Sequence, residues 1–80
     1  MQIPIIKKIV ETYTLEQLKV AEENMLNELP LGIDVEGKDE GEQLTHILAA
    51  IFIKEYMLQH GSDYSSALRA YTQKVRSSIS

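Results

Sequence analysis

Glu42 and His46 are the pair of side chains whose spacing best suits metal chemistry. They lie four residues apart, so a helix would place them on one face, where both could reach the same cation. Two ligands do not complete a site, and the chain has no cysteine and only one further histidine, His60. We therefore expect no metal site unless a dimer supplies further ligands.

The acidic segment from residue 34 to residue 42 invites comparison with a calcium-binding loop, because it contains five carboxylates and one lysine. A calcium-loop frame that starts at Glu36 puts Lys38 at its third position and Ile47 at its last, where a bidentate glutamate is needed. The segment is better interpreted as a solvated acidic loop, in which Asp39 caps the next helix.

Catalytic chemistry has equally little support in the sequence. His60 has no acidic residue at helical spacing that could orient it, and no glycine-rich turn carries a serine nucleophile. The sequence contains no glycine pattern that would cradle a phosphate. Because there is no cysteine, disulfides and thiol chemistry within the chain are excluded. We expect a protein that is not an enzyme and has no cofactor.

Length and composition indicate one small domain over residues 1–80. Of the 80 residues, 44% are hydrophobic and 25% are charged, and the net charge is −4. The longest apolar run, residues 47–53, is about a third of the roughly 20 residues that a membrane span needs. Lys7, Lys8 and Glu11 interrupt any signal-peptide core, so a cytoplasmic location is expected. A core this small rarely supplies more than about 3–5 kcal/mol without help, which favours oligomerisation.

Helix start and stop signals predict an all-α, four-helix domain. Thr14 and Gln17 form a capping-box pattern, and Asp39 with Glu42 forms a second one. Gly61 is placed to end the third helix. The predicted helices cover approximately residues 4–11, 15–29, 40–60 and 64–79, so a short N-terminal helix precedes three longer ones. One face of the second helix is expected in the core and consists of Leu15, Leu18, Met25, Leu26 and Leu29.

The third predicted helix is apolar on two opposite sides. At 100° per residue, one stripe has the form of an ordinary core-facing surface and consists of Leu44, Ile47, Leu48, Ile51, Phe52 and Leu58. A second stripe lies opposite and consists of Ala49, Ala50, Ile53 and Met57, with His46 and His60 at its two ends. Glu55 falls within the first stripe, so it either reaches the surface there or pairs with Arg69 or Arg76.

The second stripe is interpreted as the seam of a homodimer. Its alanines would let another helix come close, and the other three helices are expected to cover the first stripe. The alternative is a monomer in which the N-terminal helix covers the second stripe. A monomer mass in solution would contradict the dimer.

The fourth predicted helix has an apolar side and a basic side. Its apolar stripe consists of Tyr64, Leu68, Tyr71, Val75 and Ile79. Arg69, Gln73 and Arg76 share another face, as the residues of a recognition helix would. The net negative charge and the acidic loop argue against phosphate binding unless the loop is turned away.

Three stretches carry a family resemblance: IPIIKKIVETYTLEQL (residues 3–18), EGKDEGEQLTHILAAI (residues 36–51) and ALRAYTQKVRSSIS (residues 67–80). The chain resembles a small family of uncharacterised bacterial proteins of about this length, domains of unknown function. The resemblance implies genes that lie near those of thioredoxin-like and peroxiredoxin proteins, and hence an accessory role near thiol redox metabolism.

These observations predict a non-catalytic protein-interaction or accessory module. Its expected partners are a second copy of the chain and another protein, which the resemblance implies is redox-related. The alternative is a small nucleic-acid-binding or regulatory dimer that uses Arg69, Gln73 and Arg76. The two differ in the salt dependence of retention on heparin or DNA.

Overall fold

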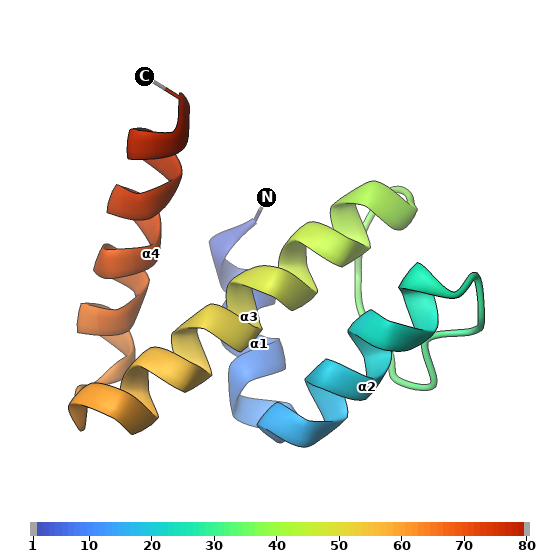
Figure 1. Ribbon diagram of the computed structural model, residues 1–80, viewed down its shortest axis with the longest axis horizontal. Helices are drawn as coiled ribbons and strands as arrows, with labels where there is room; N and C mark the ends of the chain where they lie inside the picture. Colours follow the sequence, from blue (N-terminus) through green and yellow to red (C-terminus); the bar gives the residue numbers. More distant parts are fainter. Residues whose placement is uncertain (1, 80) are drawn as a thin grey trace.

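Four α-helices form the part of the chain that the computed structural model describes, which is residues 2–79 with the side chains of residues 2–77 (Figure 1). The helices are α1 (Ile3–Thr12), α2 (Leu15–Leu26), α3 (Glu40–His60) and α4 (Tyr64–Ile79). No strand occurs among these residues, so the all-α prediction is confirmed. None of the described helices is long and apolar enough to cross a membrane.

Helix α3 is the centre of the molecule. It packs against each of the other three helices, and within the described residues those three make no helix contacts of their own. Figure 1 shows α1 behind α3, α2 alongside α3, and α4 diverging from the end of α3 in a V. A single hydrophobic cluster contains residues from all four helices and also Val35, which lies in the loop between α2 and α3.

Helix α1 is held at both ends by α3. Pro4 lies in its first turn, where a missing backbone N–H costs nothing, and Ile6, Ile9 and Val10 are buried. The last turn of α1 has no basic residue of its own. Instead the ammonium of Lys54, on α3, donates a hydrogen bond of 2.9 Å to the carbonyl oxygen of Val10, where the helix dipole favours a cation.

Helix α2 begins as predicted but ends earlier. The Thr14 hydroxyl accepts from the backbone N–H of Gln17 at 3.1 Å, and the Gln17 side chain accepts from the N–H of Thr14 at 2.8 Å. At the other end the backbone N–H of Leu29 donates to the Asn24 carbonyl at 2.8 Å, which is the long bond of a Schellman motif. Glu28 takes the left-handed position with φ 59°, so the helix stops at Leu26.

This early end corrects the predicted core face of α2. Leu18 is fully buried, but Leu26 and Leu29 are 68% and 56% exposed. The other fully buried side chain of α2 is that of Ala21, which the predicted face did not include. Once the backbone turns at Glu28, Leu29 no longer follows the helical period that placed it with Leu18.

Replacing Glu28 by glycine should stabilise the protein by about 0.5–1 kcal/mol. A side chain at positive φ carries a steric penalty of about 1–2 kcal/mol, and glycine's greater freedom in the unfolded chain takes back part of that gain. Urea denaturation followed by circular dichroism measures the change. Glu23→Gly, an exposed site within α2, is the control and should lose about 1 kcal/mol. A loss of stability in Glu28→Gly would contradict the turn described here.

The loop between α2 and α3 is tied to the domain along its length. Val35 is only 4% exposed, and the Gln43 side chain donates to its carbonyl at 2.9 Å. The Tyr13 hydroxyl accepts from the backbone N–H of Asp34 at 3.1 Å. A Cβ added at Gly37 would lie 2.9 Å from the backbone nitrogen of Gln43, so this approach requires glycine. The loop is therefore a fixed part of the structure that closes one side of the core.

Helix α3 begins and ends at the predicted residues, and Asp39 makes its own half of the predicted capping box. The Asp39 side chain accepts from the backbone N–H of Glu42 at 2.8 Å, and Gly61 adopts the left-handed conformation after α3. Asp63 caps α4, because its side chain accepts from the backbone N–H of Ser66 at 2.9 Å. Hydrogen bonds from Ser66 lower the pKa of the Asp63 carboxyl.

Candidate functional site

The predicted dimer seam lies inside the protomer. His46, Ala49, Ala50 and Ile53 all have 0% exposure, so no second chain can reach them in this fold. This part of the seam prediction is wrong. The two alanines do admit a close neighbour, but the neighbour belongs to the same chain.

Contacts of His46 and Lys54 show which helix covers this side of α3. One ring nitrogen of His46, Nε2, accepts from the backbone N–H of Gln2 at 3.1 Å, just before α1 begins. Lys54 reaches the carbonyl of Val10 near the other end of α1. Helix α1 therefore lies along the stripe, which is the arrangement that the monomer alternative predicted.

His46 is a structural residue in this arrangement. Its Nδ1 lies 2.8 Å from the carbonyl oxygen of Glu36, so Nδ1 carries the proton and Nε2 accepts from Gln2. Both ring nitrogens are therefore occupied, and His46 cannot share a metal with Glu42. The residues that the structure describes contain no group of three or more potential metal ligands.

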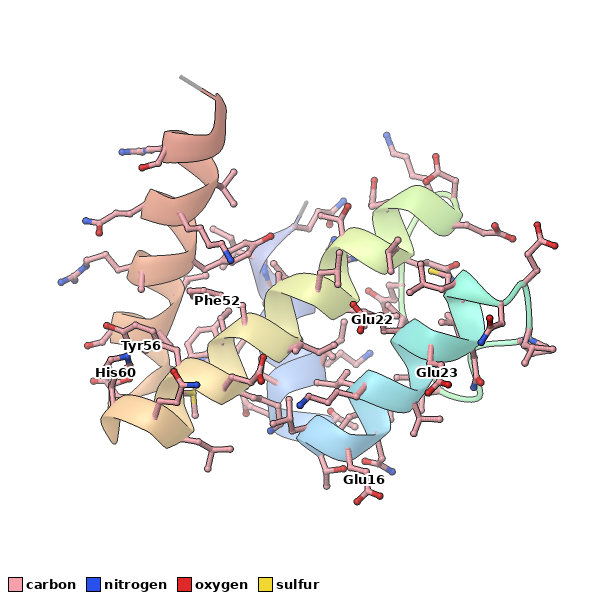
Figure 2. The ribbon with its side chains drawn as sticks, viewed as in Figure 1. Glu16, Glu22, Glu23, Phe52, Tyr56 and His60 are labelled. Atoms are coloured by element: carbon pink, nitrogen blue, oxygen red, sulfur yellow. The ribbon has the colours of Figure 1, made fainter. Side chains whose placement is uncertain are left out.

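The other two residues of the predicted seam, Met57 and His60, lie nearer the surface. Met57 is half-buried and lines a shallow apolar pocket with Leu15 and Leu58. His60 is exposed, and its ring lies 4.3 Å from that of Tyr56, centroid to centroid (Figure 2). Neither residue joins the four buried ones in a common surface.

The stripe that was expected to face the core is only partly buried. Ile47 and Ile51 are in the core, but Leu48 is 42% exposed and Leu58 is 74% exposed. Glu55 reaches the surface on this side, as one of the two interpretations predicted. Its carboxylate lies 3.5 Å from the ammonium of Lys19, rather than pairing with Arg69 or Arg76.

An open groove of about 480 Å³ lies between α3 and α4, on this same side. Phe52 forms its floor. The centroids of the Phe52 and Tyr71 rings are 5.5 Å apart. The Lys74 ammonium lies 4.8 Å from the centroid of the Phe52 ring, where the negative face of the ring attracts the cation. The groove is lined by Leu48, Ile51, Phe52, Glu55, Tyr71, Lys74 and Val75. We call this the α3–α4 groove.

Aromatic side chains continue from the groove along α3. The rings of Phe52 and Tyr56 stack at 6.1 Å, and His60 follows one turn later (Figure 2). Burial raises the pKa of the Tyr71 hydroxyl. Tyr64, at the start of α4, has a buried hydroxyl without a hydrogen-bond partner among the described residues, and burial together with the Glu11 carboxylate raises its pKa.

The basic side of α4 faces solvent. Arg69, Gln73 and Arg76 are exposed, and they lie on the side of the helix opposite the residues that pack on α3. Figure 1 shows the loop between α2 and α3 at the far end of the molecule from α4. The acidic loop is therefore turned away from these three side chains. The apolar stripe of α4 packs on α3 through Tyr64, Leu68 and Tyr71, whereas the side chain of Ile79 lies outside the described residues.

The α3–α4 groove is a surface that the sequence pattern does not predict. The first stripe of α3 and the apolar stripe of α4 each resemble an ordinary buried face. One signal was available in Glu55, whose position within the first stripe indicated that the stripe reaches solvent by its fourth turn.

The fold and its surfaces define a small all-helical protein with an apolar groove and an internally hydrogen-bonded histidine. The chain belongs to a family of unknown function, DUF6952, which matches residues 1–80. The expected resemblance to an uncharacterised family is thereby confirmed. Neither the curated proteins nor the solved structures include one that matches the chain.

Proposed function

We propose that the protein is a non-catalytic interaction module that works as a homodimer, with the α3–α4 groove of one copy packed on that of another. The observation that carries this proposal is the open groove itself. Leu48, Phe52 and Val75 contribute apolar surface to its lining, and no helix of the same chain covers it among the described residues.

The groove suits a two-fold contact with a second copy. In such a contact each residue meets the residues of the same face on the partner. The edges carry a base, Lys74, and an acid, Glu55, so a two-fold axis can bring opposite charges together while the apolar floor is buried.

The accessible surface area of the chain supports the proposal that a second copy covers the α3–α4 groove. Its accessible surface is 5343 Å², whereas a compact monomer of 9.1 kDa is expected to expose about 4,900 Å². Helix α4, like α1 and α2, packs only on α3 within the described residues, and the α3–α4 groove beside it is part of the exposed surface. Covering the α3–α4 groove in a dimer would remove apolar surface that the monomer leaves in water.

Leu48→Glu tests the homodimer. Light scattering at tens of micromolar protein should give twice the 9.1 kDa chain mass for the unchanged protein and the single-chain mass for Leu48→Glu. A carboxylate in an apolar contact costs several kcal/mol unless it is paired, which is enough to dissociate a dimer of ordinary affinity.

The matched control is Val20→Glu, which changes a side chain 50% exposed on α2. It introduces the same charge away from the groove and should leave the dimer intact. Far-ultraviolet circular dichroism should show that both variants stay folded. A single-chain mass for the unchanged protein, or a dimer in Leu48→Glu, would overturn the proposal.

A second candidate function, nucleic-acid binding by α4, is favoured by one observation. The exposed side chains of Arg69, Gln73 and Arg76 share one face, and the acidic loop lies at the opposite end of the molecule. Retention on DNA or RNA over a salt series separates the candidates, because only phosphate contacts give a steep salt dependence.

We also propose that the dimer acts in the cytoplasm as an accessory to another protein. The family resemblance points to proteins of thiol redox metabolism as the partner class. Affinity capture from the native host, with Leu48→Glu as the comparison, would identify such a partner and show whether dimerisation is needed for its recruitment.

A further inference from the structure

A second apolar surface lies at the end of the molecule where α2 stops and α3 begins. Leu26 and Leu29 are 68% and 56% exposed there, although leucine side chains lose about 1.5–3 kcal/mol each by staying in water. Leu29 lines a shallow groove of about 510 Å³, and Leu26 lies three residues before Leu29, at the end of α2. The groove is lined by Met25, Glu28, Leu29, Pro30, Leu31, Glu40 and Gln43. We call it the α2–α3 groove.

The charged residues that line the α2–α3 groove are acidic. Residues 22–42 contain eight carboxylates and one cation, Lys38. Of these carboxylates, Asp34 and Glu36 line another pocket beside α1, where Glu36 lies 3.5 Å from the Lys8 ammonium. Glu28 and Glu40 are exposed and line the groove itself. Figure 2 shows Glu22 and Glu23 on α2, the helix that ends with Leu26.

We propose that the α2–α3 groove binds a basic amphipathic helix of another protein. Leucine-sized side chains on one face of that helix would pack against Leu26 and Leu29, and its flanking lysines or arginines would face Glu28 and Glu40. Opposite charges around the contact would speed the encounter and exclude acidic partners. The inference rests on the proposed role as an interaction module, but it uses a surface separate from the α3–α4 groove.

A second copy of the chain fits the α2–α3 groove less well. Helix α4 is basic, but its apolar residues Leu68 and Tyr71 pack on α3. The exposed face with Arg69 and Arg76 would offer charge without leucines, so Leu26 and Leu29 would stay in water. The occupant must bring its own apolar face, as a partner helix does.

The test uses a synthetic peptide of leucine and lysine about 18 residues long, which forms about five turns of amphipathic helix. Titration into isotopically labelled protein should shift backbone resonances in residues 25–31 and 40–43, and should saturate. In the double variant Leu26→Ser, Leu29→Ser the dissociation constant should rise at least tenfold. The control Leu58→Ser changes a leucine that is 74% exposed at the other end of α3, and it should bind like the unchanged protein.

Three results would overturn the inference: shifts centred on the α3–α4 groove, shifts spread over all acidic residues, or an unchanged dissociation constant in the double serine variant. A peptide with glutamate in place of each lysine should not bind, and its binding would also count against the inference. The Leu48→Glu variant should bind the lysine peptide as tightly as the unchanged protein does. A failure of the proposed dimer can therefore be distinguished from a failure of the proposed peptide binding, because different variants test them.

Discussion

Replacing Ile53 by alanine should lower the free energy of unfolding by about 3–4 kcal/mol. Ile53 is fully buried in the middle of α3, where α1, α2 and α4 all pack. Truncation removes its transfer free energy and leaves a cavity that the surrounding helices cannot fully close, and such changes cost about 2–5 kcal/mol. For a domain of this size that loss approaches the whole stability. Urea denaturation monitored by circular dichroism gives the value.

Leu58→Ala is the matched control, because it makes a similar truncation on the same helix at a side chain that is 74% exposed. Its free energy of unfolding should stay within about 0.5 kcal/mol of the unchanged protein. The loss in Ile53→Ala should also persist in the Leu48→Glu background, since Ile53 belongs to the core of one protomer. An Ile53→Ala protein with unchanged stability and half the mass would restore the predicted seam.

The helix starts could be predicted from sequence because capping is local. Thr14 meets Gln17 three residues on, and Asp39 meets the backbone of Glu42 at the same spacing. Gly61 ends α3 for an equally local reason, its tolerance of positive φ. The end of α2 was placed too late because Pro30 is the obvious stop signal, whereas Glu28 adopts the left-handed conformation that glycine usually supplies.

The roles of the two stripes of α3 could not be predicted in this way. Both are apolar, and a helical wheel does not show which neighbour covers which side. The turn at Tyr13 and the loop around Val35 bring α1 and α2 against α3, and α4 leaves an open groove with α3 that is lined by Leu48 and Phe52. The excess apolar surface therefore lies around Leu48, on the stripe that was expected to be buried.

Two polar residues of α3, the buried His46 and the half-buried Lys54, also have roles that the sequence pattern does not show. His46 was predicted at a seam, and Lys54 directly follows the apolar run of residues 47–53. Both satisfy backbone groups far away in sequence, at Gln2 and at Val10. Partners at a separation of 44 residues leave no periodic signal in the chain, so only the assembled fold assigns these contacts.

His46→Leu should lower the free energy of unfolding by about 2–3 kcal/mol. Leucine keeps most of the buried volume but removes both ring nitrogens. The N–H of Gln2 and the carbonyl of Glu36 then lose their partners at 3.1 and 2.8 Å, and a buried polar group left unpaired costs about 1–3 kcal/mol. His60→Leu changes the exposed histidine of the same helix and should stay within about 0.5 kcal/mol.

Hydrogen exchange locates the effect of His46→Leu and separates it from a general loss of packing. Because His46 joins the start of α1 to the loop at Glu36, the amide protons of Ile5 and Ile6 should exchange faster in His46→Leu. The exchange rates of amide protons in the middle of α4, such as that of Tyr71, should change only by the amount that the change in global stability predicts. If the amides of α1 exchanged no faster than those of α4 after correction for global stability, His46 would be an ordinary core residue. Acceleration confined to α1 and the loop would establish it as the contact that holds α1 over Ala49, Ala50 and Ile53.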